Sequence, residues 1–153
     1  MGRYFLDSSA LAKRYQPEAG SDRVEVLFRQ SQGRMVISRL TAVEMHSVFA
    51  GRVRMGTLSP ADAAALRNHF LNDVVSTLLT VVAITDHHYS EAERLLKQHG
   101  NVFRLRTLDA LQLAVALEVH RRESLDAVVA ADHVVCQVAT AEGLPVIEPG
   151  GPV

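Results

Sequence analysis

Four scattered carboxylates are the residues of this sequence that could carry out chemistry. Asp7 and Asp132 each follow a short apolar run, while Glu44 and Asp109 lie in the first turns of two predicted helices. Carboxylates that are brought together repel one another, and some of their pKa values rise. Mg²⁺ prefers oxygen ligands, and a bound metal ion can activate water and stabilise charge on a phosphate. If they converge, these four acids indicate metal-assisted phosphodiester hydrolysis.

Each of the four acids also has an ordinary structural explanation. Asp at a strand-to-helix junction commonly caps the helix, which would account for Asp7 and Asp132. Glu44 follows Thr41 at the spacing of a capping box. Asp109 in a first helical turn interacts favourably with the helix dipole. The functional interpretation therefore depends on all four meeting in space.

Asp109 is the acid that a purely structural explanation fits least well. Its helix is apolar nearly all round over residues 108–117, which predicts that it is largely buried. A buried carboxylate is costly unless a partner compensates its charge, and no Lys or Arg follows within the next two turns. A metal ion taken from solvent would supply that partner.

The elements that must position these acids alternate between strands and helices. Short apolar runs predict strands over residues 4–6, 35–38, 78–84, 127–130 and 145–147. Helical patterns lie between them, over residues 10–15, 19–30, 40–55, 60–75, 86–100, 107–121 and 132–141. We expect Ser8 or Ser9, Ser59 and Asp86 to cap the first, fourth and fifth of these helices.

The predicted strands do not alternate in polarity, which is typical of a parallel sheet covered on both faces. The sequence thus predicts a three-layer α/β/α fold with a central, mostly parallel sheet of about five short strands. Ligands of such folds bind beyond the carboxyl ends of the strands. The connectivity places all four acids at that edge of the sheet.

Composition indicates one globular domain of ordinary type. The chain has 153 residues, of which 48% are hydrophobic and 22% charged, and we expect a domain over residues 1–148 with a loose tail over 149–153. The net charge is −1, whereas a protein that holds nucleic acid by its overall charge is usually basic. Local cations would be needed. Lys13, Arg14 and Arg39 lie near the acidic edge and could hold RNA phosphates, although a solvated face is the ordinary explanation for such residues.

Cysteine content and hydropathy bear on the compartment. The single cysteine, Cys136, cannot form an internal disulfide, which fits a reducing environment, and its neighbours predict a buried helix face. No apolar run approaches the ~20 residues that span a bilayer, and the first residues contain too short an apolar run for a signal peptide. We therefore expect a cytoplasmic protein without membrane contact.

Other chemistries fit the sequence less well. The histidines form no ligand pair at helical spacing, and there is no Gly-x-Ser-x-Gly motif for a Ser-His-Asp hydrolase. A phosphatase with Asp7 as nucleophile would need a second acid two residues later, where this chain has Ser9. Two alternatives stay open: a catalytically silent domain that binds RNA or a partner, and a DNA-directed nuclease of the same architecture.

Several segments, in this order along the chain, resemble those of the PIN-domain family, and most closely its VapC toxins. They are residues 4–13 (YFLDSSALAK), 38–44 (SRLTAVE), 106–114 (RTLDALQLA), 128–132 (VVAAD) and 141–147 (AEGLPVI). The resemblance implies an endoribonuclease that binds Mg²⁺ or Mn²⁺ through Asp7, Glu44, Asp109 and Asp132, with Ser9 in support. It also implies the toxin of a type II toxin–antitoxin pair, a homodimer, and a cognate antitoxin that blocks the pocket.

The resemblance has one departure that concerns the site. Many relatives carry Thr or Ser two residues before the last acid, where this chain has Ala130. We therefore expect a supporting hydrogen bond near Asp132 to be missing. The helices over residues 40–55 and 60–75 carry many small and apolar side chains, which could serve either core packing or a second subunit or antitoxin segment.

Overall fold

Five short parallel strands form the sheet at the centre of this computed structural model, which describes residues 2–152. The strands are β1 (Tyr4–Leu6), β2 (Met35–Ser38), β3 (Leu79–Val82), β4 (Ala127–Val129) and β5 (Val146–Ile147). Their order across the sheet is β3-β2-β1-β4-β5, and every neighbouring pair is parallel. The chain fills the sheet outward from β1 in both directions, so the strand order reverses between β1 and β4.

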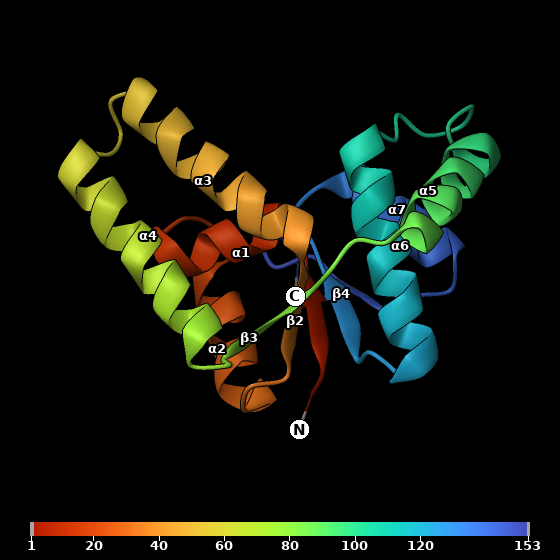
Figure 1. Ribbon diagram of the computed structural model, residues 1–153, viewed down its shortest axis with the longest axis horizontal. Coiled ribbons are helices and arrows are strands. Elements are labelled where there is room, and N and C mark those ends of the chain that lie inside the picture. The colour runs from red at the N-terminus through yellow and green to blue at the C-terminus, as the bar shows by residue number, and fades with distance from the viewer. Residues whose placement is uncertain (1, 153) are drawn as a thin grey trace.

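Within residues 2–152, seven helices cover the two faces of this sheet, which confirms the predicted three-layer fold. They are α1 (Ser8–Tyr15), α2 (Ser21–Ser31), α3 (Arg39–Arg54), α4 (Pro60–Val75), α5 (Asp86–His99), α6 (Thr107–Arg122) and α7 (His133–Ala141). Figure 1 shows α1 to α4 on one side of the strands and α5 to α7 on the other. None of these helices is both long and apolar enough to cross a lipid bilayer.

Two hydrophobic clusters hold the layers together, one on each face of the sheet. Phe5 of β1 packs into the cluster with α5, α6 and α7, whereas its neighbours Tyr4 and Leu6 pack into the cluster with α1 to α4. Successive strand residues point to opposite faces, so an entirely apolar strand buries both faces at once. The apolar runs of β1, β2 and β4 are buried throughout for this reason.

The element boundaries differ from the predicted ones where the capping residue was wrong. The side chain of Asp7 caps α1, so that helix begins at Ser8 and neither Ser8 nor Ser9 is its cap. The N-cap residue of α5 is Thr85, and Asp86 is the first residue of the helix. The edge strand β3 is shorter than the predicted 78–84 and partly exposed. In the tail, Pro149 is buried, and the backbone of Pro149 and Gly150 lies against Gly20, so that part of the tail is packed against the body.

Cys136 is buried on α7, as its neighbours predicted. Its thiol donates to the backbone oxygen of Ala130 at 3.3 Å, and burial raises the pKa of the thiol to about 12. A thiol with so high a pKa is unreactive at neutral pH, so Cys136 has a structural role.

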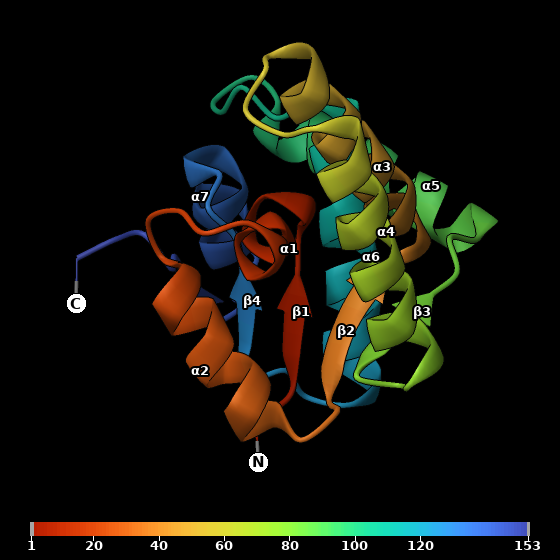
Figure 2. The same ribbon diagram turned by 90° about the vertical axis from the view of Figure 1, so that its left-hand side faces the viewer.

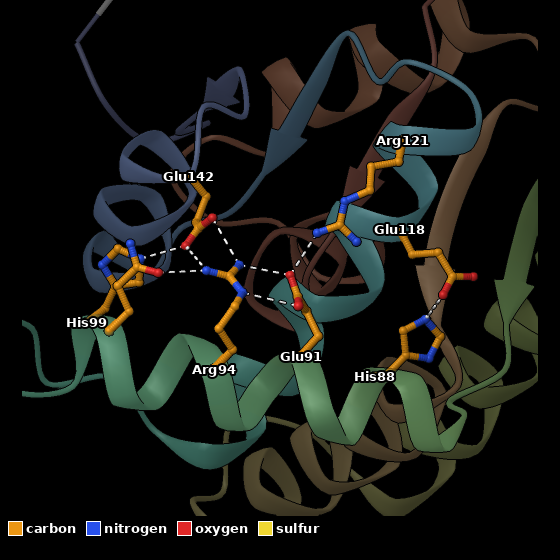
Figure 3. Close-up of polar contacts among 8 residues, drawn as sticks. His88, Glu91, Arg94, His99, Glu118, Arg121 and Glu142 are labelled. Carbon is orange, nitrogen blue, oxygen red and sulfur yellow. Dashed lines mark hydrogen bonds and ion pairs between the residues drawn. The ribbon is translucent and has the colours of Figure 1, made fainter.

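Ion pairs fasten α5 to α6 and α7, and Figure 3 shows how they share one guanidinium. Arg94 of α5 donates to both oxygens of Glu91 at 2.8 and 3.2 Å and to both oxygens of Glu142 at 3.0 and 3.1 Å. Arg121 of α6 also donates to Glu91, and His99 lies 2.7 Å from Glu142. Since α6 carries Asp109, these contacts help to hold a candidate site residue in place.

A buried histidine makes a second link between α5 and α6 (Figure 3). The ring of His88 is 1% exposed, and its Nδ1 accepts the backbone N–H of Thr85 at 3.0 Å. Its Nε2 lies 2.9 Å from a carboxylate oxygen of Glu118, although the two groups are not aligned as a hydrogen bond. This ring therefore caps α5 while it also contacts α6.

Glu91 should contribute to stability only while it is ionised. Hydrogen bonds from Arg94, outweighing burial and aided by Arg121, lower the pKa of Glu91 to about 2 from 4.5. A lowered folded-state pKa gives stability that is present above pH 4.5 and is lost as pH falls toward 2. We expect Glu91→Gln to lower the free energy of unfolding by about 1–2 kcal/mol at pH 7, measured by urea denaturation.

The control for this prediction is Glu93→Gln on the same helix, where the carboxylate is exposed. That variant should leave the free energy of unfolding unchanged at every pH. A difference between wild type and Glu91→Gln that is as large at pH 3 as at pH 7 would contradict the assignment.

Candidate active site

Asp7 is a buried carboxyl at the end of the central strand. Its side chain is 6% exposed, and Oδ1 accepts hydrogen bonds from Ala10 N at 2.9 Å and from the Ser9 hydroxyl at 2.6 Å. Within residues 2–152 no Lys, Arg or His forms an ion pair with it. Burial raises the pKa of Asp7 to about 7, against the two hydrogen bonds and with help from the charges of Asp132 and Asp109.

Ser9 connects the ends of the two strands between which the order reverses. Its hydroxyl donates to Asp7 and accepts the backbone N–H of Ala131 at 2.9 Å. Ala130 is fully buried and offers no side-chain hydrogen bond. The Ser9 hydroxyl thus adds a side-chain hydrogen bond between the β1 and β4 ends, and it reaches the Ala131 N–H and not Asp132.

Asp132 caps α7 with one oxygen and approaches an arginine with the other. Its Oδ1 accepts from the backbone N–H groups of Val134 at 2.9 Å and Val135 at 3.2 Å. Its Oδ2 lies 3.6 Å from Nη2 of Arg106. The predicted capping role is confirmed, and it leaves the second oxygen outside the cap.

Asp109 has a partner that precedes it in sequence. Arg106 Nε donates to Asp109 Oδ2 at 3.2 Å, from a position three residues earlier. The search for a cation in the turns after Asp109 missed this residue. The bond to Asp109 raises the pKa of Arg106, and the charges of Asp109, Asp132 and Glu44 add to that rise against a small effect of burial.

Glu44 lies in the second turn of α3, not in its cap. Ser38 is the N-cap and accepts the Thr41 N–H at 3.1 Å, so the expected capping box between Thr41 and Glu44 is wrong. The Glu44 carboxylate instead accepts from Gln112 Nε2 at 2.8 Å and from the Ser8 hydroxyl at 3.2 Å.

Sequence reasoning overlooked Gln112 as a residue of the site. It is 3% exposed and follows Asp109 by one helical turn, within the buried segment 110–117 of α6. One polar side chain within an apolar stretch of helix was the signal that could have identified it, because buried amides almost always have partners.

Two of the four acids, Asp109 and Asp132, contact one guanidinium, and the four acids do not converge on a common point. Within the part of the chain that the structure describes, no three His, Cys, Asp or Glu side chains lie close enough to hold one metal ion as they stand. Arg106 is instead in contact with Asp109 and Asp132, and its side chain is 73% exposed. The guanidinium therefore occupies, from the solvent side, the place beside Asp109 and Asp132.

The donor set nonetheless fits a hard divalent ion. All four candidate ligands are carboxylates, which are the oxygen donors that Mg²⁺ and Mn²⁺ prefer. Asp7 is the observation that favours a cation most, because a buried carboxyl without a cationic partner is costly to ionise. The carboxyl ends of β1, β2 and β4 lie at one edge of the sheet (Figure 2), and Asp7 and Asp132 follow β1 and β4 there.

Comparison with known proteins identifies the family. The model of the PIN domain matches residues 4–146. The chain belongs to the PIN-domain family. Among curated protein sequences, none matches it significantly.

Solved structures share the fold of this PIN domain at low sequence identity. VapC20 of Mycobacterium tuberculosis, described as a sarcin-ricin loop cleaving toxin, has a TM-score of 0.65 and 19% identity, over 95% of this chain and 97% of that one. FitAcB of Neisseria gonorrhoeae has a TM-score of 0.66 and 16% identity, over 95% and 97%. DNA-bound VapBC of Salmonella typhimurium has a TM-score of 0.61 and 19% identity, over 96% and 98%.

The three basic residues suggested as RNA contacts differ in how the PIN domain uses them. Lys13 donates to Ala19 O at 2.7 Å and lies 3.6 Å from Glu18. Arg14 is 12% exposed and is bound by Asp73 and Glu25, so its charge is already used inside the domain. Arg39, the first residue of α3, is exposed and forms no ion pair within residues 2–152.

Asp7→Asn should stabilise the metal-free PIN domain. The folded-state pKa of Asp7 lies above its unfolded value of 3.8, so the wild type loses stability as pH rises from about 4 through 7. Asn keeps the oxygen that accepts from Ser9 and Ala10 but carries no charge. In EDTA, we expect the variant to melt a few degrees above the wild type at pH 8, with a smaller difference at pH 5, by differential scanning calorimetry.

A pH-independent effect of this substitution, or a lower melting temperature at pH 8, would show that ionisation of Asp7 does not destabilise the folded domain. Asp22→Asn, on an exposed position in the first turn of α2, is the matched control and should show no pH-dependent gain.

Proposed function

We propose that this PIN domain is a Mg²⁺- or Mn²⁺-dependent endoribonuclease and the toxin of a toxin–antitoxin pair. The observation that carries the proposal is the buried, unpaired Asp7 at the strand-order reversal, with Asp132, Asp109 and Glu44 reaching the same edge from three other elements. Family membership and the toxin named among the structural relatives support it.

In this proposal Asp7, Asp109, Glu44 and Asp132 hold the cation. The cation, when bound, supplies an activated water and stabilises charge on the phosphate. Ser9 keeps the Asp7 carboxyl in one orientation. Asp7 would serve as a ligand in its ionised form, and the exposed Arg106 guanidinium, if displaced from Asp109 and Asp132, would be available to a phosphate oxygen. Arg39 holds a neighbouring phosphate at the start of α3.

A cleavage assay on labelled RNA and single-stranded DNA tests the activity. We expect RNA to be cut in Mg²⁺ or Mn²⁺ and not in EDTA. Asp7→Asn and Asp109→Asn should each reduce the rate by at least about 100-fold, since each removes charge from the cation site. Asp22→Asn on α2 is the control and should cut at the wild-type rate.

Each alternative predicts a different outcome of the same assay. Cleavage that persists in EDTA or in both Asn variants overturns the metal mechanism. Cleavage of DNA and not RNA identifies a DNA-directed nuclease, and RNA binding without any cleavage identifies a silent domain.

Arg39 is the basic residue best placed to bind RNA, because its charge is unpaired. We expect Arg39→Ala to weaken RNA binding several-fold at low salt and less at high salt, and to reduce the salt slope by about one phosphate contact. Arg34→Ala is the matched control, since Arg34 is also exposed but precedes β2 at the opposite edge of the sheet. Equal losses in the two variants, measured by fluorescence anisotropy in EDTA, would rule out a specific role for Arg39.

The proposed partners are RNA, a second copy of the chain and a cognate antitoxin. Support for a protein partner comes from exposed apolar side chains on α3, directly after it and on α4, which are Val43, Met55, Leu71 and Val75. A groove bordered by Arg39, His46, Phe70 and Leu71 runs between these two helices. VapBC complexes among the structural relatives support the antitoxin. A cytoplasmic location is part of the same proposal.

A further inference from the structure

Gln112 lies at the centre of a buried hydrogen-bond network beneath Glu44. Its Oε1 accepts from the Ser38 hydroxyl at 2.7 Å, and its Nε2 donates to the Thr41 hydroxyl at 2.5 Å and to Glu44 Oε1 at 2.8 Å. Gln112, Ser38 and Thr41 are each 3% exposed or less. The network joins the end of β2, the first turns of α3 and the buried face of α6.

The amide of Gln112 can adopt only one orientation in this network. Ser38 Oγ accepts the Thr41 N–H as the helix cap, so its own proton is free to be donated to Gln112 Oε1. The reversed amide would place its oxygen 2.8 Å from the Glu44 carboxylate, where two acceptors repel. With the Glu44 carboxylate ionised, Gln112 therefore presents an N–H to it.

We propose that Gln112 is a positioning residue that orients Glu44 for the divalent cation. The inference rests on the proposed function, because it assigns Gln112 a part in the same site. Glu44 has a long side chain with several rotatable bonds, and holding it in one conformation costs entropy. The N–H of Gln112 fixes one carboxylate oxygen before the cation binds. The conformational entropy of Glu44 is therefore lost on folding and not on cation binding. Groups of this kind behind a metal ligand typically change affinity 10- to 100-fold.

A purely structural role is the competing explanation. Gln112 also satisfies two buried hydroxyls and links α3 to α6, so its loss could weaken the fold without any effect through Glu44. The two roles differ in whether the effect of Gln112 on cation affinity depends on Glu44. A positioning effect disappears once Glu44 cannot serve as a ligand, whereas a packing effect persists in every background.

A double-mutant cycle on Mn²⁺ affinity, measured by isothermal titration calorimetry, separates the two roles. Gln112→Leu should weaken Mn²⁺ binding about tenfold in the wild type and less than twofold in the Glu44→Gln background. In the Asp132→Asn background it should again weaken binding about tenfold, because Asp132 shares no hydrogen bond with Gln112. Gln112→Met, which keeps an unbranched side chain of similar length, repeats the cycle where the Leu variant does not fold.

The outcomes distinguish this inference from the proposed function. An equal loss of affinity with and without Glu44, or no loss at all, overturns the positioning role and leaves the metal site intact. Absence of Mn²⁺ binding by the unsubstituted chain overturns both. Melting temperatures in EDTA accompany each variant, so that a loss of folded protein is not taken for a loss of affinity.

Discussion

The free-energy cost of burying the Asp7 carboxyl is the constraint on which the rest of the site depends. Asp7 ends the central strand where the strand order reverses, and its ionised form is penalised by burial. The fold compensates only in part, through the Ser9 hydroxyl and the Ala10 N–H. The remaining acids come from three other elements, so each can add its charge to this point only because β4, α3 and α6 are fixed against β1. Helix α6 in turn is held by the ion pairs of α5.

A second buried aspartate shows that the chain can neutralise such a group when stability alone matters. Asp73 is as buried as Asp7, at 6% exposure. It accepts two hydrogen bonds from Arg14 and one from Tyr15, and the Arg14 guanidinium stacks on Phe28. Asp7 has no such partner within the described residues, and the cation nearest to the cluster, Arg106, is largely exposed. Arg14 thus neutralises Asp73 permanently, whereas Asp7 has no such partner within residues 2–152, and the proposed cation site rests on this difference.

The sequence predicted the layers and the strand edges well, because both depend on local hydrophobic patterns. Unbroken apolar runs predicted the buried strands correctly, and the acids after those runs lie at the carboxyl ends of the strands, where we propose the site. Local patterns did not predict the side-chain contacts between different elements. The partner of Asp109 was sought after it and lies before it, at Arg106, because the loop and not the helix supplies the charge. Arg14 resembled a surface cation in sequence, but it pairs with Asp73, which is 59 residues away. Glu44 matched a capping box, but Ser38 began the helix three residues earlier.

Capping and cation binding are compatible roles for the acids of this site. Asp7 and Asp132 each use Oδ1 to accept backbone N–H groups at the start of a helix, which fixes the plane of the carboxyl. The second oxygen of each takes no part in that cap. Gln112 does the same for Glu44 from the side, by holding Oε1. Backbone donors thus orient one oxygen of Asp7 and of Asp132, and a buried amide orients one oxygen of Glu44, whose other oxygen accepts the Ser8 hydroxyl at 3.2 Å. The ordinary structural roles of these three acids are therefore compatible with the proposed cation site, because they fix each carboxylate before a cation binds.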